Sequence, residues 1–121
     1  MRQWLVPPQF LCDRHLLGEH VEHHMFIGTI AKGVSVQGYL DGGLLEPDML
    51  YSRHDILVSE MKRRGMKHKS PLPVIDIPDA LKHRGHVNPL HNLRDLAHRC
   101  IDCRARIESD ETLKAEISLA S

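Results

Sequence analysis

Histidine and glutamate, two side chains that can move protons or bind metal ions, are concentrated in the stretch "DRHLLGEHVEHHMF" at residues 13–26. Four histidines and two glutamates fall within the ten residues from His15 to His24. On a helix, positions seven apart differ by only about 20° around the axis. His15, Glu19 and Glu22 would therefore share one face, where an imidazole lies beside two carboxylates.

Three interpretations of this stretch are open on spacing alone. The first is an ordinary solvated polar face of a helix. The second is a metal site, since His20 and His24 lie one turn apart, but the H-E-x-x-H pattern of zinc proteases is absent, which makes this interpretation the least favoured. The third is an acid–base site, in which a carboxylate works beside an imidazole in a cleft.

The cysteines are a second set of reactive residues. Cys100 and Cys103 form a Cys-x-x-Cys pair, which can supply half of a zinc site. The nearby histidines that could complete such a site are His83, His86, His91 and His98. The pair also fits the apolar side of a helix, and redox chemistry is a third option. Because no second Cys-x-x-Cys pair is present, we predict that the two cysteines pack in the core and bind no metal. If a metal is bound, the candidate ligands are Cys100, Cys103 and His98. Cys12 is expected to be a core residue.

Positive charge is concentrated in "KRRGMKHK", residues 62–69, which holds five formal positive charges and His68. Such a cluster commonly complements the negative end of a helix dipole. It can also contact nucleic-acid phosphates, and binding would then weaken as salt rises. The whole chain gives no further guidance, since its 16 basic and 16 acidic residues cancel to a formal charge of zero.

The length of 121 residues suits one domain spanning residues 1–121. Five aromatic residues leave most of the packing to aliphatic side chains. The odd number of cysteines argues against a secreted disulfide scaffold and predicts a reducing, cytoplasmic environment. No apolar run approaches the length of a membrane span, and the proline-interrupted start does not match a signal peptide, so we expect no membrane partner.

Hydrophobic spacing predicts three main helices joined by long irregular connections. The expected helices are residues 10–30, 46–65 and 88–108. In the first, Leu17, Val21 and Met25, with Leu11 and Ile27 nearby, approximate an apolar stripe. The apolar face expected of the second is Leu50, Leu57, Val58 and Met61, and the third is expected to begin with an Asn88 cap and Pro89. Residues 33–43 are expected to form a loop, residues 70–78 a proline-rich connector, and residues 109–121 a weakly helical, fraying tail. The predicted fold is therefore a compact, all-α, single-domain bundle.

Three segments, "MRQW", "LCDRHLLGEHVEHH" and "YSRHDILVSEMKRRGMKHKSPLP", together with their order, resemble the pyrimidine-dimer DNA glycosylase family of the phage endonuclease V type. The likeness is strongest to small bacterial and phage relatives, covers about residues 1–73 and is weak after Pro73. It implies a three-helix bundle that excises a damaged pyrimidine and then cleaves the strand at the abasic site.

The resemblance also implies roles for single residues. The nucleophile is the α-amine of Met1, which attacks the sugar C1′ and forms an imine. Glu22 matches the glutamate that stabilises the sugar cation, His15 a histidine near the reacting sugar, and Arg2 a phosphate contact. An α-amine suits this chemistry because such amines titrate near pH 7.7–8.0, well below lysine. If Met1 is removed, Arg2 would supply the amine.

The chain also departs from the family pattern. Val21 stands where many relatives have an arginine, and Met25 and Phe26 replace an expected basic side chain, which removes phosphate contacts. The aromatic, basic C-terminal tail of the best-known phage enzyme is absent. These differences favour a weaker or more local grip on DNA and leave the target base open.

The sequence therefore predicts a DNA glycosylase with abasic-site lyase activity, catalysed by Met1, Glu22 and His15 without a cofactor. The residues expected to contact DNA are Arg2, Arg14, His20, Lys62, Arg63, Arg64, Lys67, His68 and Lys69. The partner is double-stranded DNA with a lesion or modified base, bound by a monomer at the nucleoid or in the host cytoplasm of a phage. The alternatives are a non-catalytic DNA-binding protein on the same fold and a small zinc-stabilised interaction domain.

Overall fold

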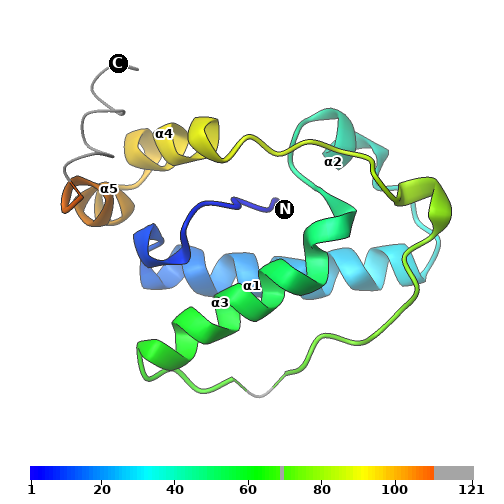
Figure 1. Cartoon of the computed structure of the whole chain (residues 1–121), viewed down its shortest axis with the longest axis horizontal. Coiled ribbons are helices and arrows are strands. Elements are labelled where there is room, and N and C mark those ends of the chain that lie inside the picture. The colour runs from blue at the N-terminus through cyan, green and yellow to red at the C-terminus, as the bar shows by residue number, and fades with distance from the viewer. Residues whose placement is uncertain (69, 111–121) are drawn as a thin grey trace.

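A computed structural model describes residues 1–68 and 70–110 of the chain, and helices account for the regular secondary structure of these residues (Figure 1). The α-helices are α1 (Asp13–Ala31), α2 (Gln37–Asp41), α3 (Leu50–Arg63), α4 (Pro89–Arg99) and α5 (Ile101–Glu108). Short 3-10 helices are η1 (Pro8–Phe10), η2 (Pro47–Met49) and η3 (Asp79–Leu81). No strand occurs in the described residues, so the all-α prediction is confirmed. The predicted tail lies outside these residues from position 111 onwards.

The prediction of one helix over residues 88–108 is wrong, because α4 and α5 are separate helices that meet at Cys100. The backbone of Cys100 is extended (φ −130°, ψ 112°), which ends α4 and begins α5. Its Sγ accepts a hydrogen bond from the backbone N–H of Cys103 and so caps α5. α4 itself starts as predicted, with Asn88 as its cap. The loop predicted for residues 33–43 also contains one short helix, α2.

The buried face of α1 differs from the predicted apolar stripe. Leu17, Val21 and Met25 are 41%, 54% and 49% exposed. The residues that α1 buries are Leu16, Glu19, His20, His23, Phe26, Ile27 and Ile30, of which Ile27 was expected near the stripe. Glu19 and His23 can be buried because Arg53 and Gln3 supply hydrogen-bond partners for them, whereas His20 lies against other histidine rings. The helix was therefore predicted correctly, although it starts at Asp13. The face that it turns towards the core was not predicted correctly.

α3 begins after η2 and follows its predicted pattern more closely. Leu50, Leu57 and Met61 are buried, and the helix ends at Arg63, two residues before Gly65, whose φ of +80° is one that glycine adopts readily. α1 and α3 pack against each other, and α4 with α5 covers another side of the bundle (Figure 1). No described helix is long and apolar enough to cross a bilayer.

The N-terminal segment belongs to the core rather than to the surface. Trp4 and Val6 are buried in an apolar cluster with side chains from α1, α3, α4 and α5, among them Leu16, Leu57, Leu96 and Ile107. A second cluster joins the end of α1 to α2, the start of α3 and the connector at Leu72. Because the first residues are packed in this way, the position of the chain terminus is defined by the fold (Figure 1).

Candidate active site

The α-amine of Met1 and the carboxylate of Glu22 form the candidate catalytic pair. The amine nitrogen lies 3.9 Å from Glu22 Oε1, and the two residues are 15% and 29% exposed. Burial raises the pKa of Glu22, while the positive amine and the backbone N–H of Arg2 favour the ionised form. The pair thus combines a partly desolvated amine with a carboxylate that remains accessible from solvent.

Gln3 and His23 hold the terminus in place. Gln3 is fully buried, its backbone N–H donates to the Leu44 carbonyl, and its Oε1 accepts from the Glu46 N–H. His23 Nδ1 lies 2.8 Å from the Glu19 carbonyl, which can only accept, so Nδ1 carries the proton. His23 Nε2 is then the acceptor for the Gln3 Nε2 amide, 3.2 Å away. The sequence pattern alone assigns no role to His23, and the structure makes it an anchor for Gln3.

Arg2 fixes the terminus against α4. Its guanidinium lies 3.7 Å from the Trp4 ring centroid and donates to Asn92 Oδ1 at 2.6 Å and Asp95 Oδ2 at 3.3 Å. Asn92 Nδ2 in turn donates to the Trp4 carbonyl. Arg2 also lines a hollow beside α4, together with His91 and other residues of that helix. Its guanidinium is therefore engaged within the protein, next to the candidate nucleophile.

Glu19, which shares a helix face with Glu22, has a different environment. It is 1% exposed and accepts two hydrogen bonds from Arg53, at 2.7 and 2.9 Å. Arg53 is 3% exposed and also donates to the Val6 carbonyl at 2.7 Å. This buried pair joins α1, α3 and the N-terminal segment. Both oxygens of Glu19 are occupied by Arg53, which leaves Glu22 as the accessible carboxylate of this face.

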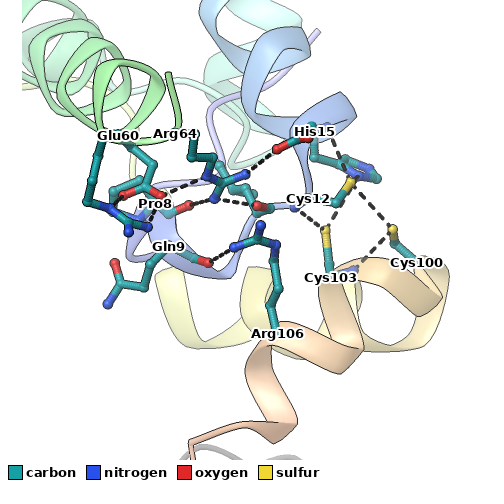
Figure 2. A network of polar contacts seen from close by, with 12 residues as sticks. Pro8, Gln9, Cys12, His15, Glu60, Arg64, Cys100, Cys103 and Arg106 are labelled. Carbon is teal, nitrogen blue, oxygen red and sulfur yellow. Dashed lines mark hydrogen bonds and ion pairs between the residues drawn. The ribbon is translucent and has the colours of Figure 1, made fainter. Parts of the chain in front are cut away.

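The basic segment at residues 62–69 divides into two groups. Arg64 is nearly buried: it donates to the Pro8 and Leu11 carbonyls and pairs with Asp13 and Glu60 (Figure 2). Arg63 is exposed but pairs with Glu60. The other exposed cations of the segment, among the residues that the structure describes, are Lys62 and Lys67, and Arg14 at the start of α1 is a further exposed cation. Lys69 lies outside the described residues.

All three cysteines meet at one place, together with His15 (Figure 2). Cys12 Sγ lies 3.9 Å from Cys100 Sγ and 3.2 Å from His15 Nδ1, which is also 3.5 Å from Cys103 Sγ. A disulfide would need sulfurs about 2.05 Å apart, so these are free thiols. The cluster joins the start of α1 to the start of α5. His98, the histidine that sequence analysis offered as a ligand, is exposed and outside it.

Four histidines form a separate cluster between α1, α3 and the following connector. His20 and His24 come from α1, His54 from α3, and His68 from beyond its end. Their ring centroids lie 4.8–5.4 Å apart in the five pairs that are in contact. Burial lowers the pKa of His20 and of His54 to about 4, so both rings are neutral at pH 7.

The structure therefore brings together some of the predicted site residues and separates another from them. It brings Met1, Glu22 and Arg2 to one place, but it directs Nδ1 of His15 towards the cysteines, with the ring edge-on to Trp4. The roles of Gln3 as an anchor and of Cys12 and His54 as cluster members were not predicted from the sequence pattern. One signal was present: Cys12 and His15 repeat, at the start of α1, the three-residue spacing of the Cys-x-x-Cys pair.

Comparison with known proteins assigns the chain to a family. The sequence model of the family described as pyrimidine dimer DNA glycosylase matches residues 1–74. No curated protein and no solved structure gives a significant match to the chain. The matched residues include α1, α3 and the Met1–Glu22 pair, and they exclude α4 and α5. The match covers more than half of the 121 residues, and the chain belongs to the pyrimidine dimer DNA glycosylase family.

Proposed function

We propose that the protein releases a damaged or modified pyrimidine from double-stranded DNA and cleaves the strand at the resulting abasic site. Its family makes it a DNA repair glycosylase. The finer proposal assigns the nucleophile to the α-amine of Met1 and the assisting carboxylate to Glu22. The observation that carries it is the 3.9 Å separation of these two groups, at a terminus held by buried contacts.

The reaction that fits this pair proceeds through an imine. The neutral amine donates its lone pair to C1′ as the bond from C1′ to the base breaks, and the base leaves with the bonding electrons. The ammonium group formed by this attack loses one of its two protons. The sugar ring then opens at the C1′–O4′ bond, O4′ gains a proton, and a positively charged imine that keeps one N–H remains. The carboxylate of Glu22 stabilises that charge electrostatically and can accept a proton from C2′. Elimination then breaks the C3′–O bond, and water releases the amine.

Residues around the pair have supporting roles in this proposal. Three residues position the terminus in this proposal. Arg2 and Gln3 follow the amine directly and bind α4 and Glu46, and His23 binds Gln3. His15 is left out of the chemistry, since its Nδ1 faces two cysteine sulfurs.

DNA phosphates are assigned to the exposed cations rather than to the whole basic segment. Lys62, Lys67 and Arg14 are exposed and can reach a phosphate backbone. Arg64 is excluded, because two backbone carbonyls and two carboxylates of the protein occupy its guanidinium. The protein must also expose or flip the target nucleotide, because the reacting atoms are not accessible within a stacked duplex.

Borohydride trapping on abasic DNA tests the proposal. Reduction of the imine should link the protein covalently to DNA, with the link mapped to Met1 by mass spectrometry. Chemical blocking of the α-amine, after mass analysis has shown that Met1 is retained, should abolish the adduct and leave DNA binding intact. A lysine-linked adduct would refute the choice of nucleophile. Binding without any adduct would favour the alternative, a non-catalytic DNA-binding protein on this fold.

A further inference from the structure

The first turns of two helices share one local arrangement of side chains that are able to bind a metal. Cys12 caps α1 and is followed three residues later by His15, and Cys100 caps α5 and is followed by Cys103. In each case the capping sulfur accepts a hydrogen bond from the backbone N–H three residues on, at 3.5 Å and 3.4 Å. The fold brings these two pairs together although they are about ninety positions apart in the chain.

The distances within the cluster match a tetrahedral zinc site. Zn–S bonds of about 2.3 Å and Zn–N bonds of about 2.0–2.1 Å place two sulfurs about 3.8 Å apart and a sulfur and a nitrogen about 3.6 Å apart. The cluster has 3.9 Å between the sulfurs of Cys12 and Cys100, and 3.2 and 3.5 Å from His15 Nδ1 to two sulfurs. All four candidate ligand atoms lie within 4.8 Å of one another.

We propose that Cys12, His15, Cys100 and Cys103 bind one structural zinc ion. Three thiolates and one imidazole fill the four positions of a tetrahedral site, which leaves none open for a catalytic water. Each sulfur also receives one backbone N–H, including that of Cys12, 3.2 Å from Cys103 Sγ. These donors stabilise thiolate charge, as do the two helix N-termini. Binding would release the thiol protons and leave a site with a net charge of −1.

The position of the site gives it a function in the fold. Residues 75–121 lie outside the family match, and they supply Cys100 and Cys103, whereas Cys12 and His15 come from the matched core. A zinc ion here would fasten α4 and α5 to α1. It would also support the catalytic terminus, because Arg2 and Trp4 bind to residues of α4. The inference does not rest on the proposed reaction, since metal content can be measured without DNA.

Metal analysis of the full-length, reduced protein tests the site. Cys100→Ser and Cys103→Ser should each lose one equivalent of zinc, whereas the matched control His98→Ala should retain it, because His98 is exposed and outside the cluster. Unchanged zinc content in both serine variants would overturn the proposal. So would a wild-type protein that takes up neither Zn²⁺ nor Co²⁺ under reducing conditions.

A second pair of measurements covers the case in which a serine variant does not fold. His15→Cys replaces the imidazole by a thiolate, so it should retain the zinc of this site, and its Co²⁺ form should show stronger sulfur-to-cobalt charge-transfer absorption. His15→Ala should lose one equivalent of tightly bound zinc. Equal zinc content in His15→Ala and the wild type would show that His15 is not a ligand and would overturn the four-residue assignment.

A different observation carries a second inference, at the four-histidine cluster. The Nε2 atoms of His20, His24, His54 and His68 are all buried, and none has a hydrogen-bond partner among the described residues. Buried polar atoms without partners are rare, and here four ring nitrogens with free hydrogen-bonding capacity gather in one place. One candidate ligand atom from each ring lies within 4.8 Å of the others. Imidazole nitrogens arranged in this way are ligands for zinc and other late divalent transition metals.

We infer that these four histidines bind a second divalent transition-metal ion. Four neutral imidazoles would leave its double positive charge uncompensated. The ion would tie the segment after α3 to α1 through His68, close to the exposed cation Lys67. It would thus order the basic segment and add positive charge beside it, where phosphate binding is proposed.

Metal stoichiometry separates this site from the first. The wild type should bind two equivalents when loaded with Co²⁺, and His68→Gln should bind one, with the charge-transfer bands of the thiolate site unchanged. The control His91→Gln, at an exposed histidine of α4, should bind two. His54→Gln provides a second variant within the cluster. Two equivalents in both His54→Gln and His68→Gln, or one in the wild type, would overturn this inference.

Discussion

Glu19 and Glu22 lie three residues apart on α1, and we predict that replacing each by glutamine has opposite consequences. Glu19→Gln should destabilise the fold and spare the chemistry, because Glu19 is 1% exposed and bound to Arg53. Glu22→Gln should spare the fold and remove base release and strand cleavage. The comparison is close, since both changes remove one carboxylate from the same helix at nearly constant volume.

The structure sets the size of each effect. Glu19→Gln leaves the Arg53 guanidinium buried without a counter-charge, and arginine cannot lose its proton to escape this. Breaking such a buried pair costs about 3–5 kcal/mol, and the low end applies because glutamine can still accept one hydrogen bond. For a chain of this length we expect Tm to fall by about 10–15 °C.

Glu22→Gln removes a partly exposed ion pair with a separation of 3.9 Å, which contributes about 0–1 kcal/mol. Burial raises the pKa of Glu22, so the folded state disfavours its charge, and neutralising it should leave Tm unchanged or slightly higher. The catalytic loss should be at least about 100-fold, the usual scale for a positioned acid–base or electrostatic group.

Thermal unfolding and single-turnover cleavage of abasic DNA measure the two effects separately. Activity is to be compared at a temperature at which both variants are folded. Glu108→Gln is the matched control, because its pair with Arg104 lies on the surface and should affect neither Tm nor rate. A Glu19→Gln variant with wild-type Tm would refute the energetic reasoning. A Glu22→Gln variant with wild-type rate, or an inactive but folded Glu19→Gln variant, would refute the assignment of roles.

Three further predictions follow from the same contacts. Because burial raises the pKa of Glu22 and its ionised form is the active one, strand cleavage from the preformed imine, which no longer depends on the free amine, should slow on acidification at a pH above 4.5, the ordinary pKa of glutamate; a cleavage step whose acid limb lies at or below 4.5 after a pH jump would contradict this. Lys67→Ala should lower the magnitude of the slope of log affinity against log salt by about one, whereas Arg64→Ala should lower Tm. Equal slopes for Lys67→Ala and the wild type would show that Lys67 does not contact DNA. His23→Ala leaves the Gln3 amide unpaired, so it should cost about 1–3 kcal/mol in denaturant unfolding and slow borohydride trapping; trapping at the wild-type rate would show that His23 does not position the amine.

Local sequence signals predicted the helices well, because capping and periodicity act over a few residues. Asn88 caps α4 and Pro89 begins it, as expected, and Gly65 follows the last turn of α3. The break at Cys100 was not predictable in this way. The helix propensity of that residue does not exclude a continuous helix. Its backbone is nevertheless extended, and its sulfur lies close to that of Cys12, which is distant in the sequence.

The buried face of α1 was mispredicted for a related reason. Periodicity assigns apolar residues to the interior, so Leu17, Val21 and Met25 were expected there. The helix instead buries Glu19 and His23, which find Arg53 and Gln3 as partners. Burial of a polar group depends on what lies opposite it, and a one-dimensional pattern holds no information on this point.

By itself, the sequence determined the helical class and, through the family motifs, the identity of Met1 and Glu22 as the residues to examine. Only the tertiary structure decided that these two groups lie 3.9 Å apart, that Glu19 is occupied by Arg53, and that His15 faces cysteines rather than solvent. The physical reason is range. Helix formation and motif spacing depend on neighbours along the chain, whereas a site depends on residues that long-range packing brings together.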